Sequence, residues 1–432
     1  MTPAAPFRPG PPGLSCRDCW YTLPLDYANP DKDTIRVYVR EVVAVGSEQA
    51  DLPCLVFFQG GPGSGSPRPM GANGWIGRAV RDYRVLLLDQ RGTGLSTPIT
   101  AQTLAAFASP EAQAAYLRHF RADNIVRDAE AIRRARQGDV AWSILGQSYG
   151  GFCAMRYLSA APAGLREVLI TGGIPPLRRT ADEIYRATYP RVIDKNRLYY
   201  ARYPQDVVRV REIVAYLDAR EVTMPSGGRL TADRFLQLGL LFGMSDGFET
   251  VHYLVEEAFV EAGMRREINW NFLVHLEQLQ AFDTNPIFSL LHEACYTQGD
   301  ASNWAAERVR AEFPVFSRDA KGPLLFTGEM IYPWMFDCYP QLKPLKEAAR
   351  LLAADAEWPM LYDADVLSRN SVPVAAAVYY DDMYVHREFS EETARLVPNM
   401  RLWVTNQYEH NGLRADGEAV LDRLLAMLRG RA

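Results

Sequence analysis

The sequence predicts an α/β fold in which a mostly parallel central sheet is interrupted by a helical insertion. In the first part of the chain, short continuously apolar runs end in glycine-rich turns and alternate with helical segments. This pattern is typical of strands that are buried on both faces of a parallel sheet. A charged, helix-like stretch follows, and strand-like runs return later. At 432 residues the chain is long enough for a large core and a second unit.

The first part of the sheet is predicted from five segments. Residues 34–45 alternate between apolar and other side chains, as expected of a half-exposed strand. Four short apolar runs are predicted to be buried strands, at residues 55–58, 85–88, 143–145 and 168–171. Residues 124–136 and 151–160 are predicted to be the helices between them.

The helical insertion follows Pro175-Pro176. Strand-like runs return after it, at residues 324–326, 374–380 and 402–405. We therefore expect the first part of the core at 1–176, a helical cap at 177–345 and the second part of the core at 346–432. The predicted helices of the cap are residues 181–189, 206–217, 232–242, 250–262 and 271–282.

Composition excludes several classes of partner. The net charge of −5 and the absence of a Lys/Arg-rich stretch argue against nucleic-acid binding. No apolar run approaches the ~18 residues that a membrane span needs. The proline-rich first residues lack the apolar centre of a signal peptide, so we expect a cytoplasmic protein. Self-association into a homo-oligomer stays open.

The six cysteines are scattered along the chain, which favours reduced thiols over a disulfide framework. Cys16 and Cys19 have the spacing of a metal or redox pair. A zinc site would need further Cys or His ligands, and the sequence has no second pair of this kind. We therefore expect these thiols to be incidental, and we expect no metal and no cofactor.

Ser148 is the candidate nucleophile. An apolar strand runs into the sequence GQSYGG at 146–151, and a helical segment follows. In a nucleophile elbow the serine sits on a sharp strand-to-helix turn, which small residues at −2 and +2, here Gly146 and Gly150, allow to close. The elbow predicts the α/β-hydrolase form of the fold.

A serine hydroxyl needs a base, and the base needs an orienting acid. In this fold the acid and then the histidine follow the serine along the chain. His410 is the histidine that follows a late strand in a loop before a final helix. Asp381 and Asp382 both lie at the end of the preceding strand, and Asp382 is our choice, with Asp381 as the alternative.

The oxyanion of the tetrahedral intermediate needs hydrogen-bond donors. We expect the backbone N–H of Tyr149, directly after the nucleophile, and that of Gly61, in the glycine-rich loop after the strand at 55–58. Arg91 lies in the segment DQRGTGLS at 89–96. We expect it to fix loops by bonding carbonyls and carboxylates rather than to touch substrate.

Three segments together resemble the proline iminopeptidase (prolyl aminopeptidase) family of α/β-hydrolases: QGGPG at 59–63, DQRGTGLS at 89–96 and GQSYGG at 146–151. The resemblance is to the longer branch of the family and covers nearly the whole chain. It implies Ser148, Asp382 and His410 as the triad, and release of N-terminal proline from short peptides. Gln59 and Tyr149 depart from the His and Trp that are common in the family.

An aminopeptidase also needs carboxylates that pair with the free ammonium group of its substrate. The family places glutamates in the cap for this purpose. The resemblance implies Glu293, in LHEACYTQG, and Glu329, in FTGEMIYPW, as the substrate-binding candidates. Nearby aromatic residues either form a pocket for the proline ring or belong to the core of the cap: Tyr296, Tyr332, Trp334 and Phe336.

Two other functions remain to be weighed. An α/β-hydrolase esterase or amidase without N-terminal selectivity would share the triad but would not need an ammonium site. A silent binding protein on the same fold would have lost a triad residue, and none is lost here.

Overall fold

The computed structural model describes residues 6–431. Its centre is a nine-stranded sheet with the order β1-β2-β3-β5-β4-β6-β7-β12-β13. Strands from β5 to β13 run parallel, whereas β1, β2 and β3 form an antiparallel edge. The strands are β1 (Arg8–Pro9), β2 (Leu14–Pro24), β3 (Thr34–Ala44), β4 (Cys54–Phe58), β5 (Arg84–Asp89), β6 (Trp142–Gln147), β7 (Leu165–Thr171), β12 (Val374–Tyr379) and β13 (Met400–Thr405).

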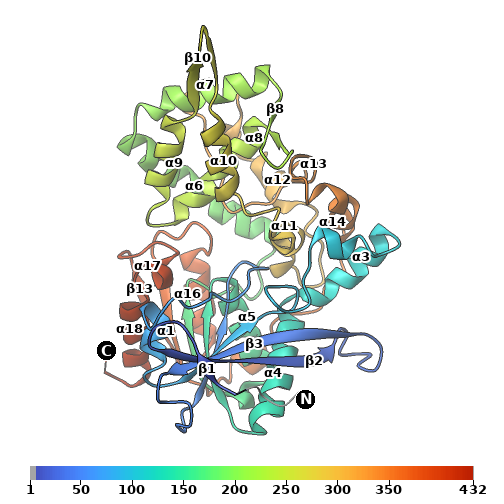
Figure 1. Ribbon diagram of the computed structural model, residues 1–432, viewed down its shortest axis with the longest axis vertical. Helices are drawn as coiled ribbons and strands as arrows, with labels where there is room; N and C mark the ends of the chain where they lie inside the picture. Colours follow the sequence, from blue (N-terminus) through green and yellow to red (C-terminus); the bar gives the residue numbers. More distant parts are fainter. Residues whose placement is uncertain (1–5, 432) are drawn as a thin grey trace.

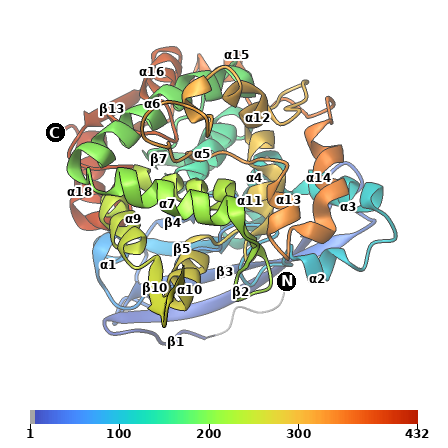
Figure 2. The same ribbon diagram turned by 90° about the horizontal axis from the view of Figure 1, so that it is seen from above.

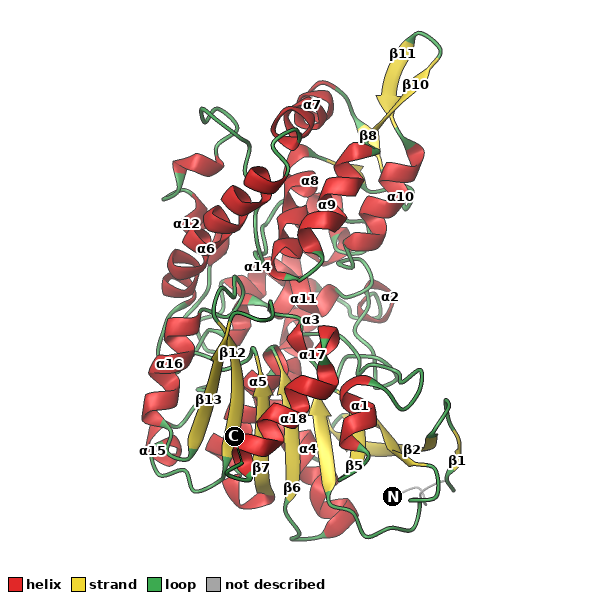
Figure 3. Ribbon diagram, turned by 90° about the vertical axis from the view of Figure 1, so that its left-hand side faces the viewer, coloured by secondary structure: helices red, strands yellow, loops and turns green. Residues whose placement is uncertain are grey.

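Both faces of this sheet are buried, as the apolar runs predict. Within β4, Val56 and Phe58 belong to one apolar cluster, and Leu55 and Phe57 belong to the cluster on the other face. Side chains alternate between the faces of a strand, so a fully buried strand is apolar throughout. Figure 3 shows α1 and α18 in front of the strands, with α4 and α5 behind them.

The helices outside the insertion, with the short 3-10 turns among them, are α1 (Gly74–Ala79), α2 (Ala101–Leu104), α3 (Pro110–Leu117), η1 (Arg118–Phe120), α4 (Ala122–Gln137), α5 (Tyr149–Ala160), η2 (Pro162–Gly164), η6 (Lys343–Leu345), α14 (Lys346–Ala353), α15 (Ala364–Leu367), α16 (Arg387–Leu396), α17 (Gly412–Ala415) and α18 (Gly417–Leu428). Most of them flank the sheet, whereas α14 packs against α3 beside the insertion (Figure 1). Among the described residues, no helix is both long and apolar enough to cross a membrane.

The insertion lies above the carboxyl ends of the parallel strands (Figures 1 and 2). We use this name for the elements from α6 to α13 and their connections. They are α6 (Ala181–Arg202), α7 (Asp206–Ala219), β8 (Val222–Thr223), β9 (Arg229–Leu230), α8 (Ala232–Leu236), η3 (Gln237–Gly243), α9 (Gly247–Glu256), β10 (Phe259–Ala262), β11 (Arg265–Ile268), α10 (Trp270–Leu279), α11 (Pro286–Leu291), η4 (Glu293–Cys295), α12 (Ala305–Arg310), η5 (Pro314–Phe316) and α13 (Met335–Cys338).

Two of the predicted elements are wrong. The helix expected to continue to residue 262 ends at Glu256, and β10 pairs with β11 as a hairpin whose turn contains Gly263. The segment 324–326, expected to be a strand, joins no sheet. Its backbone is bonded by side chains of α6 instead: Asn196 bonds both the N–H and the C=O of Phe326, and the Tyr200 hydroxyl donates to Leu324 O.

Cys16 and Cys19 lie on β2, an element that our sequence analysis did not predict. Residues three apart on a strand point to opposite faces, and these two belong to different apolar clusters. Neither forms a disulfide within the described residues. Both thiols are buried, and their interpretation as incidental groups stays a prediction.

The expected supporting role of Arg91 is also confirmed. Its guanidinium bonds both carboxylate oxygens of Asp128, at 2.7 and 2.6 Å. It also donates to three backbone carbonyls, Pro24 O, Leu25 O and His119 O. Since the side chain is fully buried, these bonds connect β2, η1 and α4 beneath the site without reaching the pocket beside Ser148.

Candidate active site

Ser148 occupies the turn between β6 and α5. Its backbone has φ 53° and ψ −124°, an unfavourable conformation for a residue with a side chain. The turn is packed closely against β4, because a Cβ at Gly150 would lie 1.9 Å from the carbonyl oxygen of Phe58. The glycine two residues after the nucleophile is thus required by the backbone of the neighbouring strand.

We expect Gly150→Ala to lower the free energy of unfolding by about 3 kcal/mol, because the added methyl group must displace a buried strand. Urea denaturation of the two proteins would measure this difference. Gly71→Ala is the matched control, since a Cβ there meets its nearest atom at 3.6 Å. Equal stability of both variants would contradict the close packing at the elbow.

The structure brings Ser148, His410 and Asp382 together. The Oγ atom of Ser148 lies 2.8 Å from Nε2 of His410, and Nδ1 of His410 lies 2.7 Å from Oδ2 of Asp382. The other carboxylate oxygen of Asp382 accepts the backbone N–H groups of Tyr384 and Val385, at 2.8 and 3.1 Å. Asp381, the alternative acid, is exposed to solvent. The arrangement has the geometry of a serine, base and acid in series.

The environment of His410 favours its cationic form. Burial alone would lower the pKa of the imidazole, but the adjacent Asp382 carboxylate raises it, and the net pKa lies above the ordinary value. A histidine of this kind can accept the serine proton and stabilise the resulting charge.

A small pocket opens beside the serine. Its lining contains both expected oxyanion donors, and Tyr149 begins α5, where a backbone N–H has no acceptor within the helix. Phe152 and Tyr296 form an edge-to-face pair in its wall, with ring centroids 5.6 Å apart. The lining residues are Gly61, Ser148, Tyr149, Phe152, His292, Cys295, Tyr296, Glu329 and Val385.

Glu329 is the carboxylate of this pocket. It is partly buried, and within the described part of the chain it makes no hydrogen bond. Burial raises its pKa to about 8, and the nearby Asp382 adds to this effect, whereas His410 opposes it. A buried carboxyl group with a raised pKa has no cation close enough to stabilise its charged form fully.

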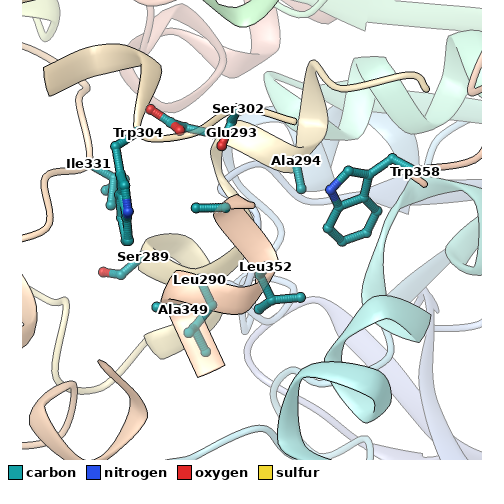
Figure 4. Close-up of a pocket in the computed structure, with 11 residues that line it drawn as sticks. Ser289, Leu290, Glu293, Ala294, Ser302, Trp304, Ile331, Ala349, Leu352 and Trp358 are labelled. Carbon is teal, nitrogen blue, oxygen red and sulfur yellow. The ribbon is translucent and has the colours of Figure 1, made fainter. Parts of the chain in front are cut away.

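The structure places Glu293 elsewhere. Its carboxylate faces a second pocket, beside Ser302 and Trp304 (Figure 4). One oxygen accepts the N–H of Ala306 at 2.9 Å, and the other accepts the N–H of Ala305 at 3.2 Å. Glu293 thus binds the N-terminus of α12, and it does not line the pocket beside Ser148.

The structure also places the four aromatic residues named in the sequence analysis in two different environments. Tyr296 lines the pocket, whereas Tyr332 is fully buried and hydrogen-bonded to Tyr189, at 3.0 Å between hydroxyl oxygens. Phe336 packs against Trp304, with ring centroids 5.7 Å apart, and Trp334 stacks on Tyr332. Those three residues form part of the core of the insertion.

His292, which was not among the predicted site residues, lines the pocket as well. Burial lowers the pKa of this imidazole to about 4, so the ring is neutral near pH 7. The signal that could have identified it is its position directly before Glu293, within the segment that supplies Cys295 and Tyr296.

Comparisons with known proteins agree with this geometry. Residues 53–240 match the alpha/beta hydrolase fold family. A proline iminopeptidase of Aeromonas sobria is 50% identical over 418 residues, which cover 96% of this chain and 97% of the relative. The chain belongs to the proline iminopeptidase family.

A second family member, proline iminopeptidase aneH of Aspergillus aculeatus, is 37% identical over 97% of this chain and 95% of its own length. Among solved structures, esterase E22 overlaps 96% of this chain and its own whole length, with 12% identity and a TM-score of 0.48. The expected family and the α/β-hydrolase fold are therefore confirmed, the fold by the match at 53–240 and by the parallel sheet.

Within the proline iminopeptidase family, Gln59 stands where histidine is usual. In this structure its backbone rather than its side chain connects the loop, because Gln59 O accepts Nε2–H of Gln90 at 3.1 Å. The bond between the two glycine-rich loops thus does not depend on the side chain at position 59.

Proposed function

We propose that the protein is a serine aminopeptidase that releases N-terminal proline from short peptides. The observation that carries this proposal is the unpaired carboxylate of Glu329 in the same pocket as Ser148. An esterase or amidase without N-terminal selectivity is the alternative, and it would have no use for a buried carboxyl group beside the nucleophile.

The proposed reaction is acyl transfer. His410 takes the Ser148 proton as Oγ attacks the scissile carbonyl, and the N–H groups of Gly61 and Tyr149 bind the oxyanion. Asp382 orients the imidazole. His410 then protonates the leaving amine, and water hydrolyses the prolyl ester of Ser148 with His410 again acting as base.

Glu329 is proposed to bind the ammonium group of the substrate. Its position in the Ser148 pocket restricts cleavage to the first peptide bond, because a longer N-terminal segment would have to pass the carboxylate. A blocked terminus would leave this buried acid without a partner. Phe152, Tyr149 and Tyr296 line the same pocket and are proposed to pack against the pyrrolidine ring.

For Glu293 we propose an indirect, positioning role. It stabilises the start of α12 and adjoins the turn that carries Cys295 and Tyr296 into the pocket. It would therefore affect the shape of the pocket rather than bind the ammonium group.

The function is tested by hydrolysis of a chromogenic prolyl amide, its N-acetylated form and an alanyl amide. We expect turnover of the free-amine prolyl substrate and none of the acetylated one. Equal turnover of both would show that there is no ammonium site and would leave the esterase or amidase alternative. The alanyl amide measures how far the pocket tolerates other residues.

Glu329→Gln is expected to lower kcat/KM for the prolyl amide by about 100-fold, because removing one partner of a buried ion pair costs about 2–5 kcal/mol.

The same variant tests the pH dependence of the reaction. Below pH 8 the carboxyl group of Glu329 in the unaltered, substrate-free protein carries a proton, since its pKa is about 8. The kcat/KM of the unaltered protein should therefore rise toward pH 8 with the ionisation of Glu329 as well as with the deprotonation of His410, and Glu329→Gln should keep only the part of the rise that follows His410.

Two further variants complete this comparison. Glu293→Gln is expected to have a smaller effect and to keep the rise toward pH 8. Glu256→Gln, on α9 of the insertion, is the control for loss of a surface carboxylate. A rise toward pH 8 that is as large in Glu329→Gln as in the unaltered protein would remove Glu329 from the ammonium site.

Three further proposals concern the location of the protein, its division into domains and its partners. The six unpaired cysteines support a cytoplasmic location. The division into core (1–176 and 346–432) and cap (177–345) is supported by the absence, within the described residues, of any strand of the nine-stranded sheet between β7 and β12. The partners proposed are peptides with N-terminal proline, without nucleic acid or membrane.

A further inference from the structure

The loop that carries His410 is attached to the insertion at three consecutive residues. Nζ of Lys195, on α6, lies 2.5 Å from Oε1 of Glu409. The backbone N–H of His410 donates to Gly243 O at 3.1 Å. Oδ1 of Asn411 accepts both the backbone N–H and the hydroxyl of Ser245, at 3.1 and 2.8 Å.

The same part of the insertion contacts the loop of the catalytic acid. The hydroxyl of Tyr384 donates to Leu240 O, while the backbone N–H of Tyr384 donates to Asp382. The ring of Tyr384 meets that of His410 edge to face, with centroids 4.7 Å apart. Residues 240–245, which we call the clamp turn, thus touch both loops that form the triad with Ser148.

The fit between the clamp turn and these loops is tight. A Cβ at Gly243 would lie 2.3 Å from Cζ of Tyr384. A side chain at this position would therefore push the clamp turn away from His410. Close approach of two backbones is one of the uses of glycine.

Lys195 is the charged member of this contact. It is 4% exposed, and among the described residues Glu409 is its hydrogen-bonding partner. A buried ammonium group is costly unless it is paired, so its pair should fix the distance between α6 and the histidine loop. The cation lies in the insertion and its anion lies next to the catalytic base.

We infer that the insertion positions the catalytic base. Lys195 and the clamp turn hold the loop of His410 at the position that the hydrogen bond between His410 and Ser148 requires. This inference rests on the proposed function, because it takes Ser148 and His410 as the reacting pair. Lys195 is then a positioning residue, and its loss should lower kcat while KM changes little.

The test compares Lys195→Met, Glu409→Gln and the double variant. Two readouts are used: kcat and KM for the prolyl amide, and the rate at which a fluorophosphonate labels Ser148. In the labelling reaction Oγ forms a bond to phosphorus, fluoride leaves, and His410 takes the serine proton. The labelling rate therefore reports the alignment of the base without the ammonium site.

We expect each single variant to lower both kcat and the labelling rate by about 10- to 100-fold, since small misplacements of a catalytic group have effects of this size. The losses of kcat and of labelling rate in the double variant should be no larger than those in the more impaired single variant, because the two residues act through one contact. Lys195→Arg should restore most of the rate. Arg202→Met is the matched control, because it removes another cation of α6, paired with Glu249 at 2.6 Å.

Unchanged kcat and labelling in Lys195→Met and Glu409→Gln, with only a lower melting temperature, would overturn the inference and leave a purely structural ion pair. A rise in KM alone would overturn it too. Failure of the unaltered protein to be labelled at Ser148 would instead contradict the proposed function itself.

Discussion

Ser148→Ala is expected to lower kcat for the prolyl amide by about 10⁶-fold, the scale of loss seen when a triad nucleophile is removed. The alanine variant keeps the pocket and the oxyanion donors but has no Oγ to attack the carbonyl. Stopped assays with high enzyme concentration would measure the residual rate. Circular dichroism would show that the fold is retained.

Ser143→Ala is the control for this change. Ser143 lies on the same strand, β6, is fully buried and donates to Glu167 at 2.9 Å, away from the pocket. Removal of the Ser143 hydroxyl should lower the free energy of unfolding and leave kcat near that of the unaltered protein. Undiminished turnover by Ser148→Ala would disprove the acyl-transfer mechanism.

Asp382→Asn is expected to lower kcat by about 10⁴-fold, as an amide at this position of a triad does. The side chain would keep its size, but the amide would no longer stabilise the imidazolium and would favour the wrong tautomer of His410. The loss should appear in kcat more than in KM, because Asp382 does not line the substrate pocket.

Asp381→Asn provides the comparison, and it resolves the choice that the sequence leaves open. Asp381 is exposed, whereas Asp382 is hydrogen-bonded to Nδ1 of His410. We expect near-normal kcat for this variant. A large loss in Asp381→Asn together with normal turnover by Asp382→Asn would exchange the roles of the two carboxylates.

Most strands of the sheet and the candidate triad could be predicted from the sequence because both are local signals. A buried strand is apolar in continuous sequence, and an elbow is defined by residues within two positions of Ser148. The choice of His410 needed only the position of a loop between a strand and the last helices.

The elements that were missed depend on contacts made at a distance. Residues 324–326 are apolar, and only the side chains of Asn196 and Tyr200 show why they do not join a sheet. Glu293 and Glu329 occupy similar sequence surroundings. The position of α12 determines that Glu293 is already bonded, while Glu329 faces the pocket. No pattern within either segment contains that information.

The pairing of β7 with β12 has a consequence for the order of folding. Val168 lies beside Val374, so this parallel pair forms across the whole insertion. Pairings of such long range are slow, because the loop-closure entropy is lost before the contact contributes. The insertion should therefore become compact first and shorten the path between the two strands. During synthesis Ser148 emerges long before Asp382 and His410, so the nascent chain stays inactive until its last strands have docked.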